Sequence, residues 1–145
     1  MIRSELSGKQ ARGWGRIPFI SSESALNIPA EMVHYGVSKA APQGVSRGLA
    51  KVLAGSGVTV NTILPGPTRT EGAQAMMAKP AEERGVSVEE MEALFLQENR
   101  PSTLLGRFAS PKEVASLSVY AASPQASATT GAALRVEGGI VESIA

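Results

Sequence analysis

The sequence predicts an α/β fold in which three parallel strands are joined by helices. Three short segments rich in β-branched and other apolar residues lie far apart, at 16–22, 59–64 and 133–137. Segments with helical spacing of apolar residues separate them, and parallel strands need crossover connections of this kind. The chain has 145 residues and no long linker rich in Pro, Gly or Ser, so residues 1–145 are expected to form a single domain.

Each predicted strand has a clear end signal. The first, 16–22, follows a glycine-containing turn, and the second, 59–64, is stopped by the sequence Pro-Gly-Pro at 65–67. The third, 133–137, is closed by two glycines. Pro18 lies within the first strand, where it removes one donor from the hydrogen-bond ladder. Because this is tolerated mainly at a sheet edge, we expect the first strand to be an edge strand.

A helix is predicted over residues 35–53, before Gly55 and Gly57. Its expected apolar face is formed by Val45, Leu49 and Val52. Pro42 lies inside this segment, where a proline costs about 3 kcal/mol and removes one helical hydrogen bond. We therefore expect either a kink or a second helix that begins near Pro42.

Capping boxes mark the starts of two more helices. Ser110 is an N-cap followed by Pro111, with Glu113 three residues after the cap, and Ser87 and Glu90 repeat the pattern. The apolar stripe predicted for the later helix is Val114, Leu117 and Ala121. The apolar residues of the earlier region are Met76, Met77, Met91, Leu94 and Phe95. Their helical spacing favours packing over a wall that contacts a substrate.

Composition excludes several classes of function. With 14 Lys+Arg against 13 Asp+Glu, the chain has no electrostatic case for nucleic acid or for an anionic membrane. Cysteine is absent and His34 is the only histidine, so no disulfide and no metal site is expected. Residues 1–10 lack the apolar core of a secretory signal, and the uncharged stretch 114–134 is too polar to span a membrane. A cytoplasmic protein is expected.

Residues suited to proton transfer gather around the first strand and the following helix. Ser21 and Ser22 end the strand, Tyr35 follows Ser22 by thirteen residues, and Lys39 follows Tyr35 by four. Residues four apart share a helix face, and an ammonium beside a phenol favours the phenolate. Tyr35 could then exchange a proton near neutral pH, although a Tyr and Lys at this spacing also occur by chance on exposed helix faces.

This constellation resembles the short-chain dehydrogenase/reductase family, in particular its 3-oxoacyl-acyl-carrier-protein reductases. The resemblance extends from Gly15 to Gly139. Further segments that match the family in the correct order are Gly106-Arg107, Ser110 to Ala115, Thr130-Gly131 and Val136 to Gly139. It implies a partial Rossmann (doubly wound) fold, with strands corresponding to the family's fifth to seventh, flanking helices and a helical substrate lid at 69–108.

The resemblance also implies roles for individual residues. Tyr35 would protonate the carbonyl oxygen, Lys39 would support the phenolate and bind the nicotinamide ribose, and Ser22 would hold the substrate oxygen. The implied cofactor is NAD(P), and the residues that would bind it are Tyr35, Lys39, Pro65, Gly66, Thr68 and Thr70. The implied substrate is a small carbonyl or alcohol compound or an acyl thioester.

The family's glycine-rich phosphate loop is not visible in this sequence. The segment 13–15 resembles its first part, but Pro18 stands at the third glycine's place and a strand follows. By resemblance, the chain lacks the N-terminal nucleotide-binding half. Two hypotheses follow: an NAD(P)-dependent oxidoreductase, or a truncated, catalytically inactive remnant with a binding or assembly role. An exposed strand edge favours a homo-oligomer. The resemblance implies the same, since paired helices usually build dimers and tetramers in this family.

Overall fold

The computed structural model describes residues 2–144, with side chains from residue 6 onward. One parallel sheet, in the order β1-β2-β3, is built from β1 (Gly15–Ile20), β2 (Val58–Pro65) and β3 (Ala133–Val136). The three predicted strands are confirmed, with ends that differ by one or two residues. Strand β1 lies at an edge of this sheet, which is the position expected from Pro18.

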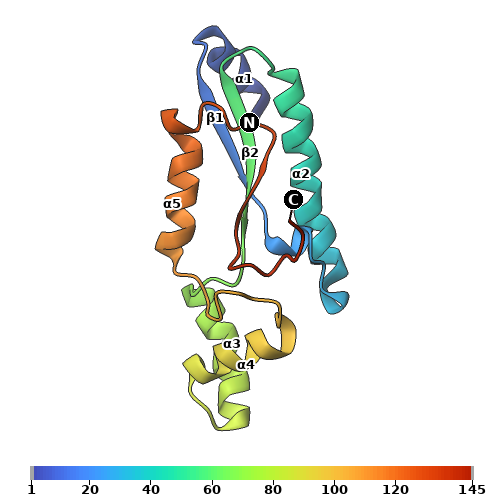
Figure 1. The fold of residues 1–145 in the computed structure, drawn as a ribbon, viewed down its shortest axis with the longest axis vertical. Coiled ribbons are helices and arrows are strands. Elements are labelled where there is room, and N and C mark those ends of the chain that lie inside the picture. The colour runs from blue at the N-terminus through green and yellow to red at the C-terminus, as the bar shows by residue number, and fades with distance from the viewer. Residues whose placement is uncertain (1, 145) are drawn as a thin grey trace.

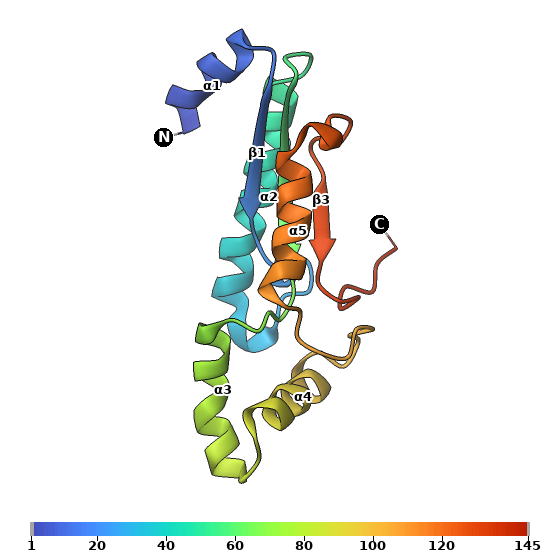
Figure 2. The same cartoon turned by 90° about the vertical axis from the view of Figure 1, so that its left-hand side faces the viewer.

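Helices cover both faces of the sheet. The helices are α1 (Ile2–Ala11), α2 (Val33–Val52), α3 (Glu71–Arg84), α4 (Val88–Asn99) and α5 (Pro111–Ala122). Short 3₁₀ turns are η1 (Glu23–Ala25), η2 (Ala30–Met32) and η3 (Pro124–Ala126). Figures 1 and 2 show α2 and α5 on opposite faces, and α3 with α4 as an arm beyond the carboxyl ends of the strands. We call residues 69–108 the helical arm. This architecture confirms the predicted partial Rossmann-like α/β fold.

Helix α2 is continuous from Val33 to Val52 with Pro42 inside it, so no second helix begins at Pro42. The prediction that Val45, Leu49 and Val52 form the buried face of this helix is wrong. Val45 and Val52 are 51% and 72% exposed, whereas Leu49 packs against the core together with Leu53. Apolar residues lie on more than one side of α2, so hydrophobicity alone could not identify the side that faces the sheet.

The core follows β2, which is buried from Val58 to Leu64. This uninterrupted burial is expected for a central strand covered by helices on both faces. Asn61 is a polar exception whose amide bonds through both of its ends: Nδ2 donates to the Thr129 carbonyl at 2.8 Å, and Oδ1 accepts from the Ala132 amide at 3.1 Å. Asn61 thereby holds the segment that leads into β3 against the middle of the sheet.

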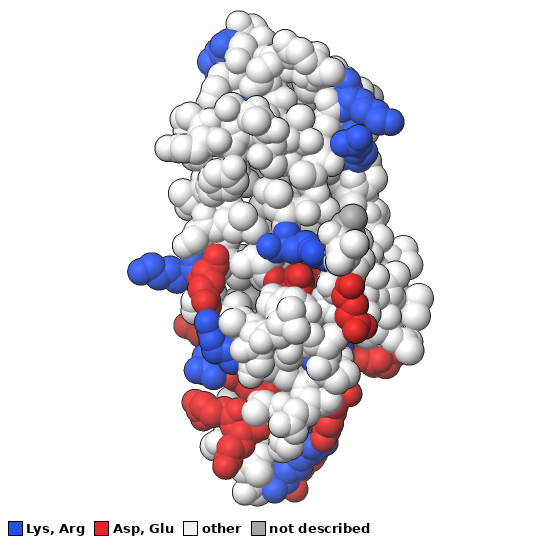
Figure 3. All heavy atoms as spheres, viewed as in Figure 1, with Lys and Arg blue, Asp and Glu red and all other residues white. Residues whose placement is uncertain are grey.

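The helical arm has a small core of its own. Met77 and Ala81 of α3 are buried against Met91 of α4, and Leu94 and Phe95 pack around them. The preference for packing over a substrate wall is confirmed for these residues, whereas Met76 is 71% exposed. In Figure 3, charged side chains of both signs gather over the arm, while the face over the upper sheet is mostly uncharged.

Both predicted capping boxes are confirmed, at Ser87 with Glu90 and at Ser110 with Glu113. The uncharged stretch 114–134 divides into the rest of α5, the turn η3 and β3. Within residues 2–144, no helix combines the length and apolar character that a membrane crossing requires.

Glu113 makes a pH-dependent contribution to stability. The Arg107 guanidinium donates to both carboxylate oxygens, at 3.0 and 2.8 Å, and the Ser110 amide donates at 2.7 Å. These bonds, that from Arg107 first, lower the pKa of Glu113 from its ordinary 4.5 to about 2. A lowered pKa in the folded state stabilises the fold above the unfolded pKa, and this contribution is lost as the pH falls from about 4.5 to about 2.

We predict that Glu113→Gln lowers the urea midpoint at pH 7 and that the gap from the unsubstituted chain closes between pH 4.5 and about 2. Urea titrations at pH 7, 4.5, 3 and about 2 measure this gap. Glu71→Gln, which removes an exposed first-turn carboxylate of α3, is the control and should show a smaller pH-dependent gap. A gap for Glu113→Gln that stays constant across this range would contradict the assignment.

Candidate functional site

The serine pair lies where β1 leaves the sheet. Ser21 extends the ladder by one residue, because its amide donates to the Ile63 carbonyl at 2.8 Å. Ser22 then caps the turn η1, with its Oγ accepting from the Ser24 amide at 3.2 Å. Ser22 is 9% exposed. Its oxygen is engaged as an acceptor while its O–H remains available to donate.

Tyr35 and Lys39 lie in the first turns of α2, and both are half-buried. The Lys39 Nζ lies 5.5 Å from the centre of the Tyr35 ring, so the ammonium and the phenol are neighbours. The Ser21 hydroxyl donates to the Lys39 carbonyl at 2.5 Å. This bond docks the end of β1 onto α2, so the structure brings the serine pair to the helix segment that holds Tyr35 and Lys39.

The loop that follows β2 lies at the same carboxyl edge of the sheet. A Cβ on Gly66 would lie 2.7 Å from the Glu137 carbonyl oxygen, so only glycine allows this approach to the end of β3. The Thr68 hydroxyl donates to the Gly66 carbonyl at 2.9 Å. Thr70 is the N-cap of α3, its Oγ1 accepting from the Ala73 amide at 3.1 Å. Pro65, Gly66, Thr68 and Thr70 therefore form one short, internally bonded segment.

Two charge pairs at this edge involve a deeply buried carboxylate, and sequence reasoning missed both. Arg100 Nε donates to Glu23 Oε1 at 2.9 Å, and Arg69 donates to both oxygens of Glu92, to Oε1 at 3.2 Å and to Oε2 at 2.5 Å. The Glu23 and Glu92 side chains are each 4% exposed. Glu92 also raises the pKa of the Arg69 guanidinium through these hydrogen bonds. Residues separated by 77 and 23 positions follow no spacing rule that could have revealed the pairs.

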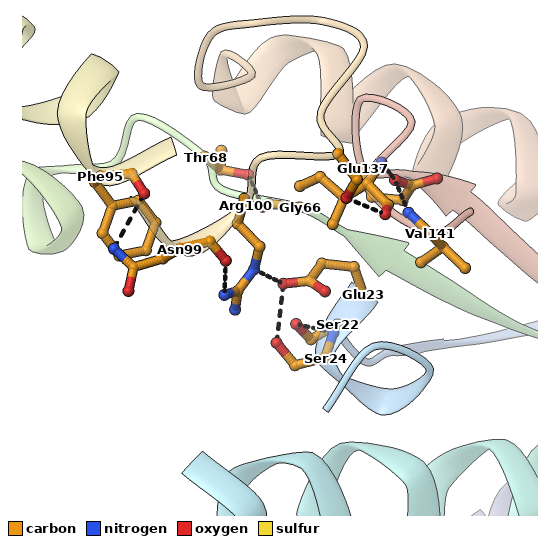
Figure 4. Close-up of polar contacts among 12 residues, drawn as sticks. Ser22, Glu23, Ser24, Gly66, Thr68, Phe95, Asn99, Arg100, Glu137 and Val141 are labelled. Carbon is orange, nitrogen blue, oxygen red and sulfur yellow. Dashed lines mark hydrogen bonds and ion pairs between the residues drawn. The ribbon is translucent and has the colours of Figure 1, made fainter. Parts of the chain in front are cut away.

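A third buried carboxylate, Glu137, organises the segment after β3. Its Oε2 accepts from the Ile140 amide and, at 3.2 Å, from the Val141 amide (Figure 4). These bonds fold the two glycines after β3 into a tight turn beside the loop at Gly66. The carboxyl edge of the sheet is thus closed by backbone turns that side-chain carboxylates hold in place.

A hollow of about 360 Å³ lies at the opposite end of the sheet, beside the amino ends of β1 and β2. It is lined by the turns around Gly13 and Gly57, and none of the predicted site residues borders it. No group of three or more His, Asp or Glu side chains that could hold a metal ion occurs among residues with described side chains. Ser22, Tyr35 and Lys39 lie instead near the carboxyl ends of the strands.

Comparison with known proteins agrees with this fold. A family model described as "Enoyl-(Acyl carrier protein) reductase" matches residues 2–141. The chain belongs to the short-chain dehydrogenase/reductase family. It is 42% identical over 130 residues to the uncharacterized oxidoreductase YvaG of Bacillus subtilis, covering 90% of this chain and 49% of that protein. It is 35% identical over 133 residues to an acetoacetyl-CoA reductase of Rhizobium meliloti, covering 92% and 49%.

A solved structure of this short-chain dehydrogenase/reductase family extends the likeness to three dimensions. The L-sorbose reductase of Gluconobacter frateurii, solved in complex with NADPH and L-sorbose, superposes with a TM-score of 0.89 at 28% identity. The match covers 98% of this chain and 53% of that one. The chain therefore spans about half the length of the relatives that it matches.

The site fits one end of a nicotinamide cofactor. Tyr35, Lys39 and the loop from Pro65 to Thr70 offer hydroxyls, an ammonium and loop backbone at one sheet edge, which suits a ribose and a carboxamide. In residues 2–144, no strand is followed by a G-x-G-x-x-G turn that opens a helix, so those residues do not supply the family's pyrophosphate site.

Gly36, next to Tyr35, sets how closely the segment before α2 packs on the helix. A Cβ on Gly36 would lie 2.5 Å from Ile28 Cγ2, whereas a Cβ on Gly48 of the same helix would meet nothing within 4 Å. We predict that Gly36→Ala destabilises the fold by about 1–3 kcal/mol through overpacking against Ile28. Gly48→Ala should stabilise it by about 0.5–1 kcal/mol, because glycine is a poor helix former. Urea denaturation measures both, and equal midpoints for the two variants would refute this packing.

Proposed function

We propose that this chain supplies the Ser-Tyr-Lys part of an NAD(P)-dependent oxidoreductase that reduces a ketone or oxidises a secondary alcohol. The observation that supports this proposal is the juxtaposition at one sheet edge. The turn of Ser22 is docked on α2 through Ser21 and Lys39, the Lys39 ammonium lies beside the Tyr35 ring, and the loop after β2 lies at the same edge. Carboxyl edges of parallel sheets are the usual place for such a site.

In this proposal each side chain has one task. The Tyr35 hydroxyl donates its proton to the carbonyl oxygen, and the Ser22 O–H donates a hydrogen bond to the same oxygen. The Lys39 ammonium stabilises the negative charge left on the Tyr35 oxygen after proton transfer. NAD(P)H, when bound, supplies the hydride that reduces the carbonyl carbon. In the alcohol oxidation the proton returns along the same path to Tyr35.

The proposed substrate class is a 3-oxoacyl thioester or a related small carbonyl compound. Relatives that match the chain are named as acetoacetyl-CoA reductase and as 3-oxoacyl-[acyl-carrier-protein] reductase. The helical arm, residues 69–108, is the proposed substrate lid. It lies beyond the carboxyl ends of the strands (Figure 2), and its α4 is tied to the loop after β2 by Arg69 and Glu92.

A second candidate is a catalytically inactive remnant with a binding or assembly role. The observation that favours it is that the chain spans about half the length of the relatives that it matches. In that case the Tyr35–Lys39 pair would persist without a bound cofactor. The two candidates differ in one measurable property, which is affinity for the cofactor.

We predict saturable binding of NADH or NADPH with a dissociation constant of roughly 1–100 µM. Nicotinamide fluorescence during titration with the chain measures it. Lys39→Met should weaken this affinity by about tenfold or more, since the charge that faces the ribose is removed. Lys112→Met, on the exposed start of α5, is the control and should leave the affinity unchanged. An absence of saturable binding by the chain favours the remnant.

We predict that Tyr35→Phe lowers kcat for acetoacetyl-CoA reduction by about 10²–10⁴, because the proton donor is removed while the ring remains. Cofactor affinity should change little. Tyr120→Phe, which alters a 44% exposed tyrosine on α5, is the matched control and should retain full activity. Absorbance at the nicotinamide band follows the reaction, and similar rates for the two variants would exclude Tyr35 as the donor.

We also propose that the chain self-associates. The outer edge of β1 has no strand partner among the described residues, and valines of α2 at positions 37, 45 and 52 are 58%, 51% and 72% exposed. Both features favour association with a second copy. We predict dimers or larger species in sedimentation velocity at about 10 µM, shifted toward monomer by Val45→Glu. Met76→Glu, at a 71% exposed site on the arm, should not shift them. A monomer at all concentrations would refute self-association.

A further inference from the structure

The carboxylate that follows Ser22 is a deeply buried charge near the proposed site. Glu23 is the first residue of the turn η1, and its side chain is 4% exposed. A carboxylate removed from water is costly unless an opposite charge and hydrogen bonds compensate it. Its charged partner is Arg100, 77 residues later in the chain, whose side chain is 10% exposed. An acid beside the proposed serine is therefore neutralised from the helical arm.

A short series of hydrogen bonds connects this ion pair to the serine hydroxyl (Figure 4). Arg100 Nε donates to Glu23 Oε1 at 2.9 Å, and Ser24 Oγ donates to the same oxygen at 3.0 Å. The Ser24 amide in turn donates to Ser22 Oγ at 3.2 Å. The serine oxygen and the arginine are thus two side chains apart, and both connecting residues belong to the same three-residue turn.

Arg100 is itself fixed by the end of α4. It is the C-cap residue of this helix, where its amide donates to the Leu96 carbonyl at 2.8 Å. Its Nη1 donates to the carbonyl of Asn99 at 2.7 Å, and Leu96 is buried. The position of the guanidinium therefore depends on the position of the C-terminal end of α4.

The structure offers no replacement for Arg100 at this carboxylate. The second oxygen, Glu23 Oε2, is buried and has no hydrogen-bond partner among the described residues. With Arg100 removed, the carboxylate would keep only the Ser24 hydroxyl as a donor. A buried charge in that state moves toward water, and this movement disturbs the turn that begins at Ser22.

We propose that Arg100 is a positioning residue for Ser22. By holding the Glu23 carboxylate it fixes the η1 turn, so the serine hydroxyl is correctly placed only while the end of α4 keeps Arg100 against Glu23. This inference rests on the proposed function, in which Ser22 donates to the substrate oxygen. A donor displaced by about 1 Å loses much of its effect on the rate, and seating of the arm therefore controls the serine half of the site.

The test compares four variants of the chain with a matched control. Arg100→Met keeps the length of the side chain without its charge, and Arg100→Lys restores the charge. Glu23→Gln and the double variant Glu23→Gln with Arg100→Met remove the buried charge. Arg84→Gln is the control, because Arg84 forms an exposed ion pair with Glu98 that links α3 to α4 in the same arm. Two readouts are hydrogen exchange of peptides covering residues 21–28, and the kinetics of acetoacetyl-CoA reduction, measured as kcat and as the KM for the cofactor.

The expected result is that Arg100→Met speeds exchange of the Ser24 and Ala25 amides by about tenfold or more and lowers kcat by about 10- to 100-fold. The KM for the cofactor should change less than about twofold, since the loop after β2 is untouched. Arg100→Lys should recover most of the loss, and the double variant should exchange more slowly than Arg100→Met. Arg84→Gln should resemble the unsubstituted chain in both readouts.

Three outcomes would overturn the inference. Unchanged exchange at 21–28 in Arg100→Met would show that Arg100 does not hold the turn. Faster exchange with unchanged kcat would show that the turn does not position the serine, and equal behaviour of Arg100→Met and Arg100→Lys would assign Arg100 a packing role. A chain without any turnover contradicts the proposed function instead, and the exchange rates then decide whether Arg100 holds the turn.

Discussion

Strand β2 is the constraint on which the remaining structure depends. It is buried from Val58 to Leu64 and pairs in parallel with β1 along one edge and with β3 along the other. Because the strands are parallel, the carboxyl ends of all three lie at the same end of the sheet. The ladder bond from Ser21 to Ile63 fixes where β1 ends relative to β2. The turn of Ser22, the loop after Pro65 and the glycine turn after β3 are neighbours for this reason.

The parts of this arrangement that the sequence predicts are the local ones. The capping boxes at Ser87 and Ser110 depend on residues three apart, and the Tyr35–Lys39 contact depends on residues four apart, so each is specified within one helical turn. The β-branched sequence of β2 and its terminal proline are local signals as well. The side of α2 that faces the sheet is not local. Small and polar residues such as Ala50 and Ser46 pack there, whereas the larger Val45 points outward.

The charged contacts that complete the site have no local signal. Glu23 resembles an ordinary first-turn acid, and Arg100 resembles a basic residue at a helix C-terminus, where the helix dipole alone would favour each of them. Only the tertiary fold makes them partners, across 77 residues. The same holds for Glu92, which is buried although the other three glutamates of its helix are exposed. Burial, which separates Glu92 from Glu89, Glu90 and Glu98, is decided by the packing of the arm on the loop after β2.

The Glu23–Arg100 pair is expected to add little to the stability of the fold, which favours a positioning role for it. Replacing a buried ion pair by apolar residues of similar volume is often neutral or stabilising, because desolvation offsets the attraction between the charges. Here the cost is higher still, since Glu23 Oε2 is buried and no described residue forms a hydrogen bond with it. The position of this pair directly beside Ser22 therefore agrees better with the proposed role in fixing the turn than with a role in strengthening the core. In the proposed role, the position of the Ser22 hydroxyl depends on an ion pair between residues 77 positions apart in the sequence. The positions of Tyr35 and Lys39 relative to each other depend on one helix.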